Sequence, residues 1–224
     1  MAWRVRDTTT QMEMLLMPVG TFVMGEAGWA EPVHSVTLTQ SFYMGRYEVT
    51  QSQWVAKMGS NPSYFAGQAD SANRPVDQVS WNTIQGYLSA TGMRLPSEAE
   101  WEYACRAGTT TAFHNGSNDD ATVGTMAWDN GNSDSQTHVV GGKAGNALGL
   151  NDMSGNVWEW VNDWTAVYSS GSQTNPTGAG SGSARVLRGG SWNVNSYMVR
   201  SSLRNAASPD VTAGSIGFRV VRNP

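Results

Sequence analysis

The side chains that could perform redox or metal chemistry are few in this chain of 224 residues. A single cysteine, Cys105, excludes an intramolecular disulfide and a metal site built from several thiolates. The three histidines, His34, His114 and His138, lie in unrelated contexts, and none has a histidine or carboxylate two positions away. We therefore predict that the histidines are structural or face solvent, and that Cys105 is a buried apolar residue on a helix.

Three helices are predicted to position the remaining polar side chains. Thr50 with Gln53, and Ser97 with Glu100, have the spacing of a capping box, in which each side chain binds a backbone N–H group of the other residue. The helices predicted from these signals and from apolar periodicity run from 51 to a stop at Gly59, from 81 to 91, and from the residues beside Pro96 to a stop at Gly108.

The rest of the chain is predicted to consist of short strands and long loops. Residues 12–49 contain apolar runs broken by Gly and Pro, which favours short strands. Residues 109–183 are rich in Gly, Asn, Ser, Asp and Thr, so we expect loops fixed by buried tryptophans. The strand-like runs RVLRGGSW and IGFRVV are expected to pair with the N-terminal strands, which places residues 1–224 in a single domain.

Composition argues against several classes of function. The formal net charge is -4 and no cluster of Lys or Arg is present, so nucleic acid is not an expected partner. No apolar stretch approaches the roughly 18 to 20 residues that span a bilayer. The N-terminus lacks the apolar core of a signal peptide, which predicts a cytoplasmic protein unless an export signal has been removed.

Several strings, in order along the chain, resemble the formylglycine-generating-enzyme or sulfatase-modifying-factor superfamily. They are MPVGTFVMG, YEVTQSQW, RPVDQVSW, MRLPSEAEWEYACRAG, GLNDMSGNVWEWVNDW, RVLRGGSW and IGFRVV. The resemblance implies an α+β fold of the C-type-lectin kind, with a small antiparallel sheet, two or three helices and much irregular coil.

The departures from this superfamily argue against catalysis. Its catalytic members bind copper through paired cysteines between their GGSW-like and GFR-like strings, and they oxidise a substrate cysteine. The corresponding residues 193–215 contain no cysteine. Another branch builds an iron site from histidines, for which this chain has no matching pair. We predict a non-catalytic protein, and the alternative is an enzyme or enzyme accessory of the superfamily with unnamed chemistry.

Residues 193–215 resemble the variable region of proteins that are diversified by diversity-generating retroelements. These elements randomise adenines, commonly in Asn codons, and the changed codons encode a binding surface. An Asn codon altered at its adenines keeps a pyrimidine in third place and cannot encode Met, Trp, Lys, Gln or Glu. Met198 breaks this rule, so it derives from another codon or is fixed. The alternative is an ordinary loop of a non-catalytic family member.

This second resemblance implies that the segment binds a protein or a cell-surface ligand. Arg200, Arg204 and Asp210 are predicted to stabilise the scaffold, because a guanidinium can bind several carbonyl and carboxylate groups at once. The predicted ligand-binding residues are Asn193, Val194, Asn195, Tyr197, Met198, Leu203, Asn205, Ala206, Ala207, Ser208, Val211, Thr212, Ala213, Gly214 and Ser215.

The affinity of such a surface depends on its large side chains. Most of the segment is small and neutral, so we expect weak binding unless Tyr197, Met198 and Leu203 lie together. Tyr197 is the best anchor among them. The alternative for Leu203, and for Val199 beside it, is a place in a strand core.

The family resemblance also implies a calcium site. In catalytic relatives the string that matches LNDMSGNVWEW binds calcium, and the matching ligands here are the side chains of Asp152 and Glu159 and the carbonyls of Gly155 and Val157. Two carboxylates with intervening carbonyls form a site of hard oxygen ligands. The alternative is that Asp152 and Glu159 bind backbone N–H groups in a turn.

Overall fold

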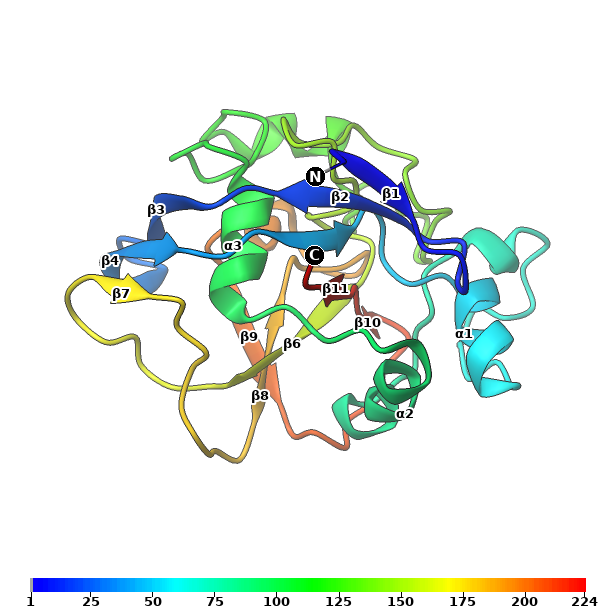
Figure 1. Ribbon diagram of the computed structural model, residues 1–224. Coiled ribbons are helices and arrows are strands. Elements are labelled where there is room, and N and C mark those ends of the chain that lie inside the picture. Colours follow the sequence, from blue (N-terminus) through cyan, green and yellow to red (C-terminus); the bar gives the residue numbers. More distant parts are fainter. Residues whose placement is uncertain (1) are drawn as a thin grey trace.

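The structure is a computed structural model that describes residues 2–224. Within these residues, three small sheets, three α-helices and three 3-10 helices are joined by long stretches of coil (Figure 1). The predicted mixture of helices, small sheets and irregular coil is confirmed.

The first sheet joins the two ends of the chain (Figure 1). Its strands, in spatial order, are β1 (Arg4–Arg6), β2 (Glu13–Met17), β5 (Phe42–Gly45) and β11 (Val221–Arg222). All of its pairings are antiparallel, and Val221 lies opposite Met44. The predicted pairing of the IGFRVV run with N-terminal strands is therefore confirmed for its last residue, Val221, whereas its first two residues, Ile216 and Gly217, pair in another sheet.

The second sheet carries part of the 193–215 segment. Its strands, in spatial order, are β10 (Ile216–Gly217), β6 (Trp158–Trp164), β8 (Arg185–Arg188) and β9 (Arg204–Ala207). Strand β8 pairs with β6 and β9, so the expectation that the RVLRGGSW run pairs with N-terminal strands is wrong. Residues 158–164 were expected to be a loop. They form a strand that is buried along most of its length, and such a strand lacks the alternation that marks a half-exposed one.

The third sheet is a long hairpin with a short third strand. Strand β3 (Gly20–Glu26) pairs with β4 (Ala30–Leu38), and β7 (Gln173–Thr174) runs parallel to β4. A bulge interrupts the hairpin at Gly25, whose φ is 91° and whose added Cβ would lie 2.4 Å from the carbonyl oxygen of Ala30. The prediction of antiparallel pairing holds for most strands, but β7 and β10 pair in parallel.

Local sequence signals position the helices. They are α1 (Gln51–Met58), α2 (Trp81–Thr91) and α3 (Glu98–Arg106), and each begins with a capping box. Gly59 and Gly92 end the first two helices in the left-handed conformation, as predicted. The expected stop of the third at Gly108 is one residue late, because Ala107 adopts the left-handed cap with a φ of 48°.

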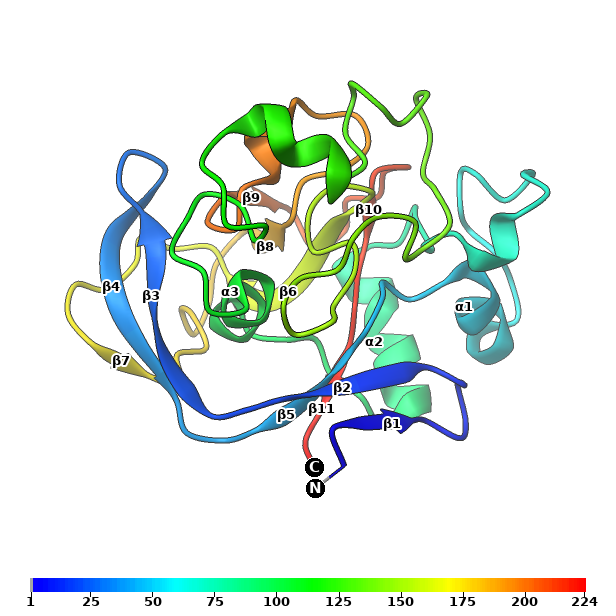
Figure 2. The ribbon, with the colours of Figure 1, turned by 90° about the horizontal axis from the view of Figure 1, so that it is seen from above.

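Helix α3 lies between the β3–β4 hairpin and the β6–β8 sheet, as both views show (Figures 1 and 2). Trp101 on this helix and Trp160 on β6 are fully buried, together with the charged side chains of Arg188 and Arg219. The interior therefore contains ion pairs as well as apolar side chains.

Within residues 2–224, no helix has the length and apolar character needed to cross a membrane.

Candidate ligand-binding surface

Residues 193–215 run along one side of the molecule as the 3-10 helix η3 (Ser196–Val199), strand β9 and several turns. In Figure 2 the orange start of this segment lies on the same side as the β3–β4 turn and the 3-10 helix η2 (Asp120–Thr125). Ser196 Oγ lies 3.2 Å from Asp120 Oδ2, so η2 and η3 are in contact.

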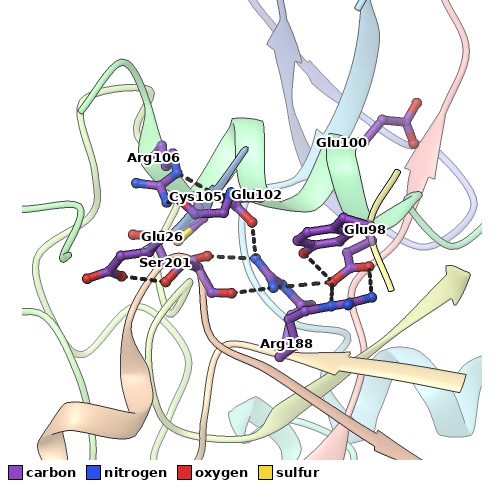
Figure 3. Close-up of polar contacts among 12 residues, drawn as sticks. Glu26, Glu98, Glu100, Glu102, Cys105, Arg106, Arg188 and Ser201 are labelled. Carbon is purple, nitrogen blue, oxygen red and sulfur yellow. Dashed lines mark hydrogen bonds and ion pairs between the residues drawn. The ribbon is translucent and has the colours of Figure 1, made fainter. Parts of the chain in front are cut away.

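Arg188 fixes the main chain of this segment from the interior. Its guanidinium donates to the carbonyl oxygens of Ser201 and Ser202 at 2.7 and 2.8 Å (Figure 3). Both acceptors are backbone atoms, so these bonds do not depend on which side chains the segment carries.

Helix α3 balances the charge of Arg188. The Arg188 side chain is fully buried, and its Nη atoms lie 2.6 Å from Glu102 Oε2 and 3.3 Å from Glu98 Oε1. Burial alone would lower the pKa of Arg188, but the carboxylates of Glu102 and Glu98 hold that pKa above its usual value. A buried charge is tolerated only when it is paired and hydrogen-bonded, so α3 is part of the support of the segment.

The charged side chains within the segment attach it to the scaffold, as predicted. Arg200 Nη1 lies 2.5 Å from Glu26 Oε1 on the β3–β4 hairpin. Arg204 donates to both oxygens of Glu98 at 2.7 and 2.8 Å. Asp210 accepts a hydrogen bond of 2.6 Å from an asparagine near the start of α2. These contacts fix the segment at three separated points.

Most of the predicted ligand-binding residues face solvent. The exposed members are Asn193, Asn195, Tyr197, Asn205, Ala206, Ser208, Val211 and Thr212. The half-buried members are Val194, Met198, Ala207, Ala213, Gly214 and Ser215. Leu203 is different, because it is only 8% exposed and packs in the main apolar core. Leu203 and the fully buried Val199 therefore lie in the interior, as the alternative expected, but Val199 belongs to η3 and Leu203 directly precedes β9, so neither is in a strand.

Two aromatic residues outside the segment border this surface, and sequence reasoning missed both. The ring of Trp29, in the β3–β4 turn, has its centroid 6.0 Å from that of Tyr197. Tyr64, between α1 and η1 (Ser71–Asn73), lies against Gly214 and is 72% exposed. The signal available for Trp29 was its place in the short turn EAGWA, because a side chain in so short a turn has little core to enter.

The acidic residues of the LNDMSGNVWEW string lie in the interior, away from solvent. Both oxygens of Glu159 accept hydrogen bonds from Arg219, at 2.6 to 2.9 Å, and Trp101 Nε1 donates to Glu159 at 2.7 Å. Asp152 Oδ2 accepts from the backbone N–H of Gly141 at 2.6 Å. The alternative to a calcium site was that both carboxylates bind backbone N–H groups. Asp152 does so, whereas Glu159 binds the side chains of Arg219 and Trp101.

A calcium ion does not fit this arrangement unless it displaces the guanidinium of Arg219. Gly155 and Val157 are buried close to these carboxylates in the chain, and Val157 N donates to Glu48 at 3.3 Å. Burial, with the nearby carboxylates, raises the pKa of Glu48 well above its usual value. Among residues 2–224, no group of three or more His, Cys, Asp or Glu side chains is placed to hold a metal ion. These contacts do not test calcium binding itself, and the implied site would form only if Arg219 moved away from Glu159.

The lone thiol has the buried position predicted for it. Cys105 is fully buried on α3, and its Sγ lies 3.6 Å from the carbonyl oxygen of Met153. Burial raises the pKa of the Cys105 thiol to about 11, so it is protonated at neutral pH. His34 and His114 are buried and His138 is half-buried, which agrees with structural roles.

The match to a family model decides the family. A model of the sulfatase-modifying factor enzyme 1-like domain matches residues 3–224. The chain belongs to this family. Mouse formylglycine-generating enzyme is a relative that is 35% identical in an alignment of 185 residues, which covers 74% of this chain and 50% of the mouse protein. The formylglycine-generating enzyme of Streptomyces coelicolor is 38% identical in an alignment of 166 residues, which covers 66% of this chain and 52% of that enzyme. The chain spans about half the length of these curated relatives.

Solved structures of similar proteins establish the fold of this family member. Treponema denticola variable protein 1 superposes with a TM-score of 0.92, at 28% identity over 100% of both chains. PvdO from Pseudomonas aeruginosa gives a TM-score of 0.84, at 28% identity over 99% of this chain and 98% of PvdO. The U1 variant of the Major Tropism Determinant shares the fold at a TM-score of 0.50 and 21% identity, over 81% of this chain and 50% of its own. The C-type-lectin-like α+β fold predicted from the sequence is thereby confirmed.

Proposed function

We propose that this member of the sulfatase-modifying-factor family is a non-catalytic protein that binds a protein or cell-surface ligand through residues 193–215. We further propose that a diversity-generating retroelement diversifies this surface. The observation that carries the proposal is how the segment is supported. Arg188 binds the main-chain carbonyls of Ser201 and Ser202 in a buried stretch, and exposed side chains of the segment lie before this stretch, as at Tyr197, and after it, as at Asn205.

This arrangement separates the stability of the fold from the chemistry of the surface. Substitution of exposed side chains usually changes the free energy of unfolding by less than about 0.5 kcal/mol. The residues that are costly to replace are the buried Val199 and Leu203 and the paired Arg200 and Arg204. A ligand-binding face can therefore change while its support stays intact.

Two further observations support the proposal. Treponema denticola variable protein 1, whose name denotes variability, matches this chain along the full length of both. Every exposed residue of the segment can be encoded by an Asn codon that is altered at its adenines. Met198, which cannot be encoded in this way, is half-buried and packs against the main core. A fixed Met198 is consistent with that position.

The alternative is an enzyme or enzyme accessory, and the identity to the formylglycine-generating enzymes favours it. The copper chemistry that the family resemblance implies uses two cysteines in the segment. This chain has one cysteine, and it is fully buried on α3. For these reasons we prefer the binding function to the oxidase function.

Sequencing of the gene from independent isolates tests the diversification. We expect differences concentrated in the codons of the exposed residues of 193–215, together with a reverse-transcriptase gene and a near-copy of this DNA in the same locus. An unvarying segment in a complete locus without either element would refute diversification.

An activity assay tests the non-catalytic assignment. The purified protein is incubated with copper(I), oxygen and a cysteine-containing peptide, and aldehyde formation is measured by mass spectrometry. We expect no product. Copper-dependent turnover of the peptide would establish the alternative.

A further inference from the structure

An exposed aromatic pair lies at the boundary between the 193–215 segment and the β3–β4 hairpin. Trp29 is 44% exposed and Tyr197 is 41% exposed, although their ring centroids are only 6.0 Å apart. Large aromatic side chains that stay accessible on a folded protein are typical of contact sites for partners.

The hairpin turn is attached to the segment by contacts that do not involve Tyr197. The guanidinium of Arg200 lies 4.5 Å from the ring centroid of Trp29, and it also forms the ion pair with Glu26. Ser202 Oγ donates to the other oxygen of Glu26 at 2.5 Å. Trp29 is therefore held beside position 197 whichever side chain that position carries.

Three carboxylates lie near this aromatic pair, one beside the hairpin turn and two beside η3. Glu31 lies near the hairpin turn, where it accepts from the backbone N–H of Gly28 at 2.9 Å. Asp119 and Asp120, at the start of η2, are exposed beside η3. Lys143 approaches the opposite end of η2 and binds the carbonyl of Gly124 there. The charge of Arg200, beside Trp29, is paired with Glu26, so the three carboxylates leave this end of the surface with a net negative charge.

We propose that Trp29, although it lies outside the 193–215 segment, is a constant anchor of the binding surface. We propose further that this end of the surface receives a segment of a protein partner in which an apolar side chain is flanked by Lys or Arg. The apolar side chain packs against the exposed parts of Trp29 and of the side chain at position 197, and the cations lie near Glu31, Asp119 and Asp120. This inference rests on the proposed binding function, and it names the chemistry of the partner.

A selection from a phage-displayed library of random linear peptides provides a defined probe. The purified protein is the target, and the dissociation constants of the enriched peptides are measured for the wild type and for variants. Trp29→Ser removes the anchor, and Tyr197→Ser tests whether a peptide binds at the segment. Trp3→Ser is the matched control, because Trp3 is 53% exposed near the N-terminus, on the opposite side from the hairpin turn in Figure 2.

We expect enriched peptides that combine Lys or Arg with a large apolar residue. Trp29→Ser should weaken their binding at least about tenfold, as the loss of an aromatic anchor does, whereas Trp3→Ser should leave it unchanged. Trp29→Phe should restore most of the affinity. Thermal unfolding of each variant verifies that a loss of binding is not a loss of folding.

The charge is tested with a triple variant that replaces Glu31 by Gln and both Asp119 and Asp120 by Asn. The rate at which the enriched peptides associate with this variant should fall several-fold, and the dependence of that rate on ionic strength should weaken.

Peptides that lose affinity with Tyr197→Ser but not with Trp29→Ser would overturn this inference while the proposed function stands. Enrichment of neutral or acidic peptides would refute the proposal that the partner segment carries Lys or Arg. If no peptide responds to Tyr197→Ser or to changes at other exposed residues of the segment, both proposals fail.

Discussion

At the scale of single residues, Asp77 shows how a buried carboxyl group supports the rim of the surface. Asp77 is fully buried, and its Oδ1 accepts from the backbone N–H of Tyr64 at 2.7 Å, while its Oδ2 has no hydrogen-bond partner among residues 2–224. Burial raises the pKa of Asp77 from an ordinary 3.8 to about 7. The folded state therefore favours the protonated form of this side chain.

This raised pKa predicts a stability that falls as the pH rises. Between pH 3.8 and about 7 the folded state binds a proton at Asp77 that the unfolded state does not bind. The free energy of unfolding therefore decreases with rising pH across this window, by at most about 1.4 kcal/mol per pH unit. Asp77→Asn keeps the acceptor for Tyr64 and removes the titration. We expect the variant to gain stability relative to the wild type as the pH rises to 8.

Urea denaturation of both proteins at a series of pH values measures this difference. Burial also raises the pKa of Asp163 to about 7 and that of Asp152 to about 6, and these groups titrate in both proteins. The effect of Asp77 is therefore the difference between the free energies of unfolding of the two proteins at each pH. Parallel curves for the wild type and Asp77→Asn would show that Asp77 is ionised in the folded state throughout.

At the scale of elements, the segment depends on β8 and α3 through one guanidinium. Arg188→Met removes two hydrogen bonds to the segment and leaves Glu102 without one of its ion-pair partners in the interior. Removal of one member of a buried ion pair typically costs about 3 to 5 kcal/mol. We expect a loss of this size in the free energy of unfolding, measured by urea denaturation.

The matched control for this variant is Arg4→Met. Arg4 also forms an ion pair, with Glu13 at 2.5 Å, but its side chain is 54% exposed. Exposed pairs contribute about 0 to 1 kcal/mol, so this variant should retain nearly all of its stability. Equal losses for the two variants would contradict the role of Arg188 as the support of the segment.

The elements also show which parts of the fold the sequence predicts. The starts of the predicted helices are correct because Thr50 and Ser97 lie three residues before the partners that complete their capping boxes. The predictions of a loop at β6 and of N-terminal partners for β8 were wrong, because strand pairing depends on residues far apart in the chain. Trp160 of β6, for example, lies opposite Leu187 of β8.

The candidate surface also has features that the sequence predicts and features that depend on packing between distant residues. The accessible residues of the 193–215 segment follow from its composition and its resemblance to a variable region. The burial of Leu203 and the contact between Trp29 and Tyr197 depend on how the hairpin and the segment pack, and no local pattern specifies that packing. The sequence alone thus predicts the accessible residues of the segment and misses the aromatic residues that border it.

At the scale of the whole molecule, calcium is not expected to stabilise the fold. Arg219 occupies the position beside Glu159 where a cation would be needed, with contacts of 2.6 to 2.9 Å. A ligand that binds only the folded state raises the melting temperature. We therefore expect the same melting temperature in excess EDTA and in millimolar calcium. A saturable rise with calcium would show that the family site forms here and that Arg219 moves to admit the ion.

The independence of the fold from the side chains of its binding surface is tested most directly by randomisation. In one library, the codons of the exposed residues of 193–215 are randomised, and in a matched library those of the buried Val199, Ser201, Ser202 and Leu203 are randomised. The fraction of variants that resists proteolysis is then counted by sequencing. We predict that most members of the first library stay folded and that few members of the second do. Comparable unfolding in the two libraries would contradict a scaffold that tolerates surface diversity.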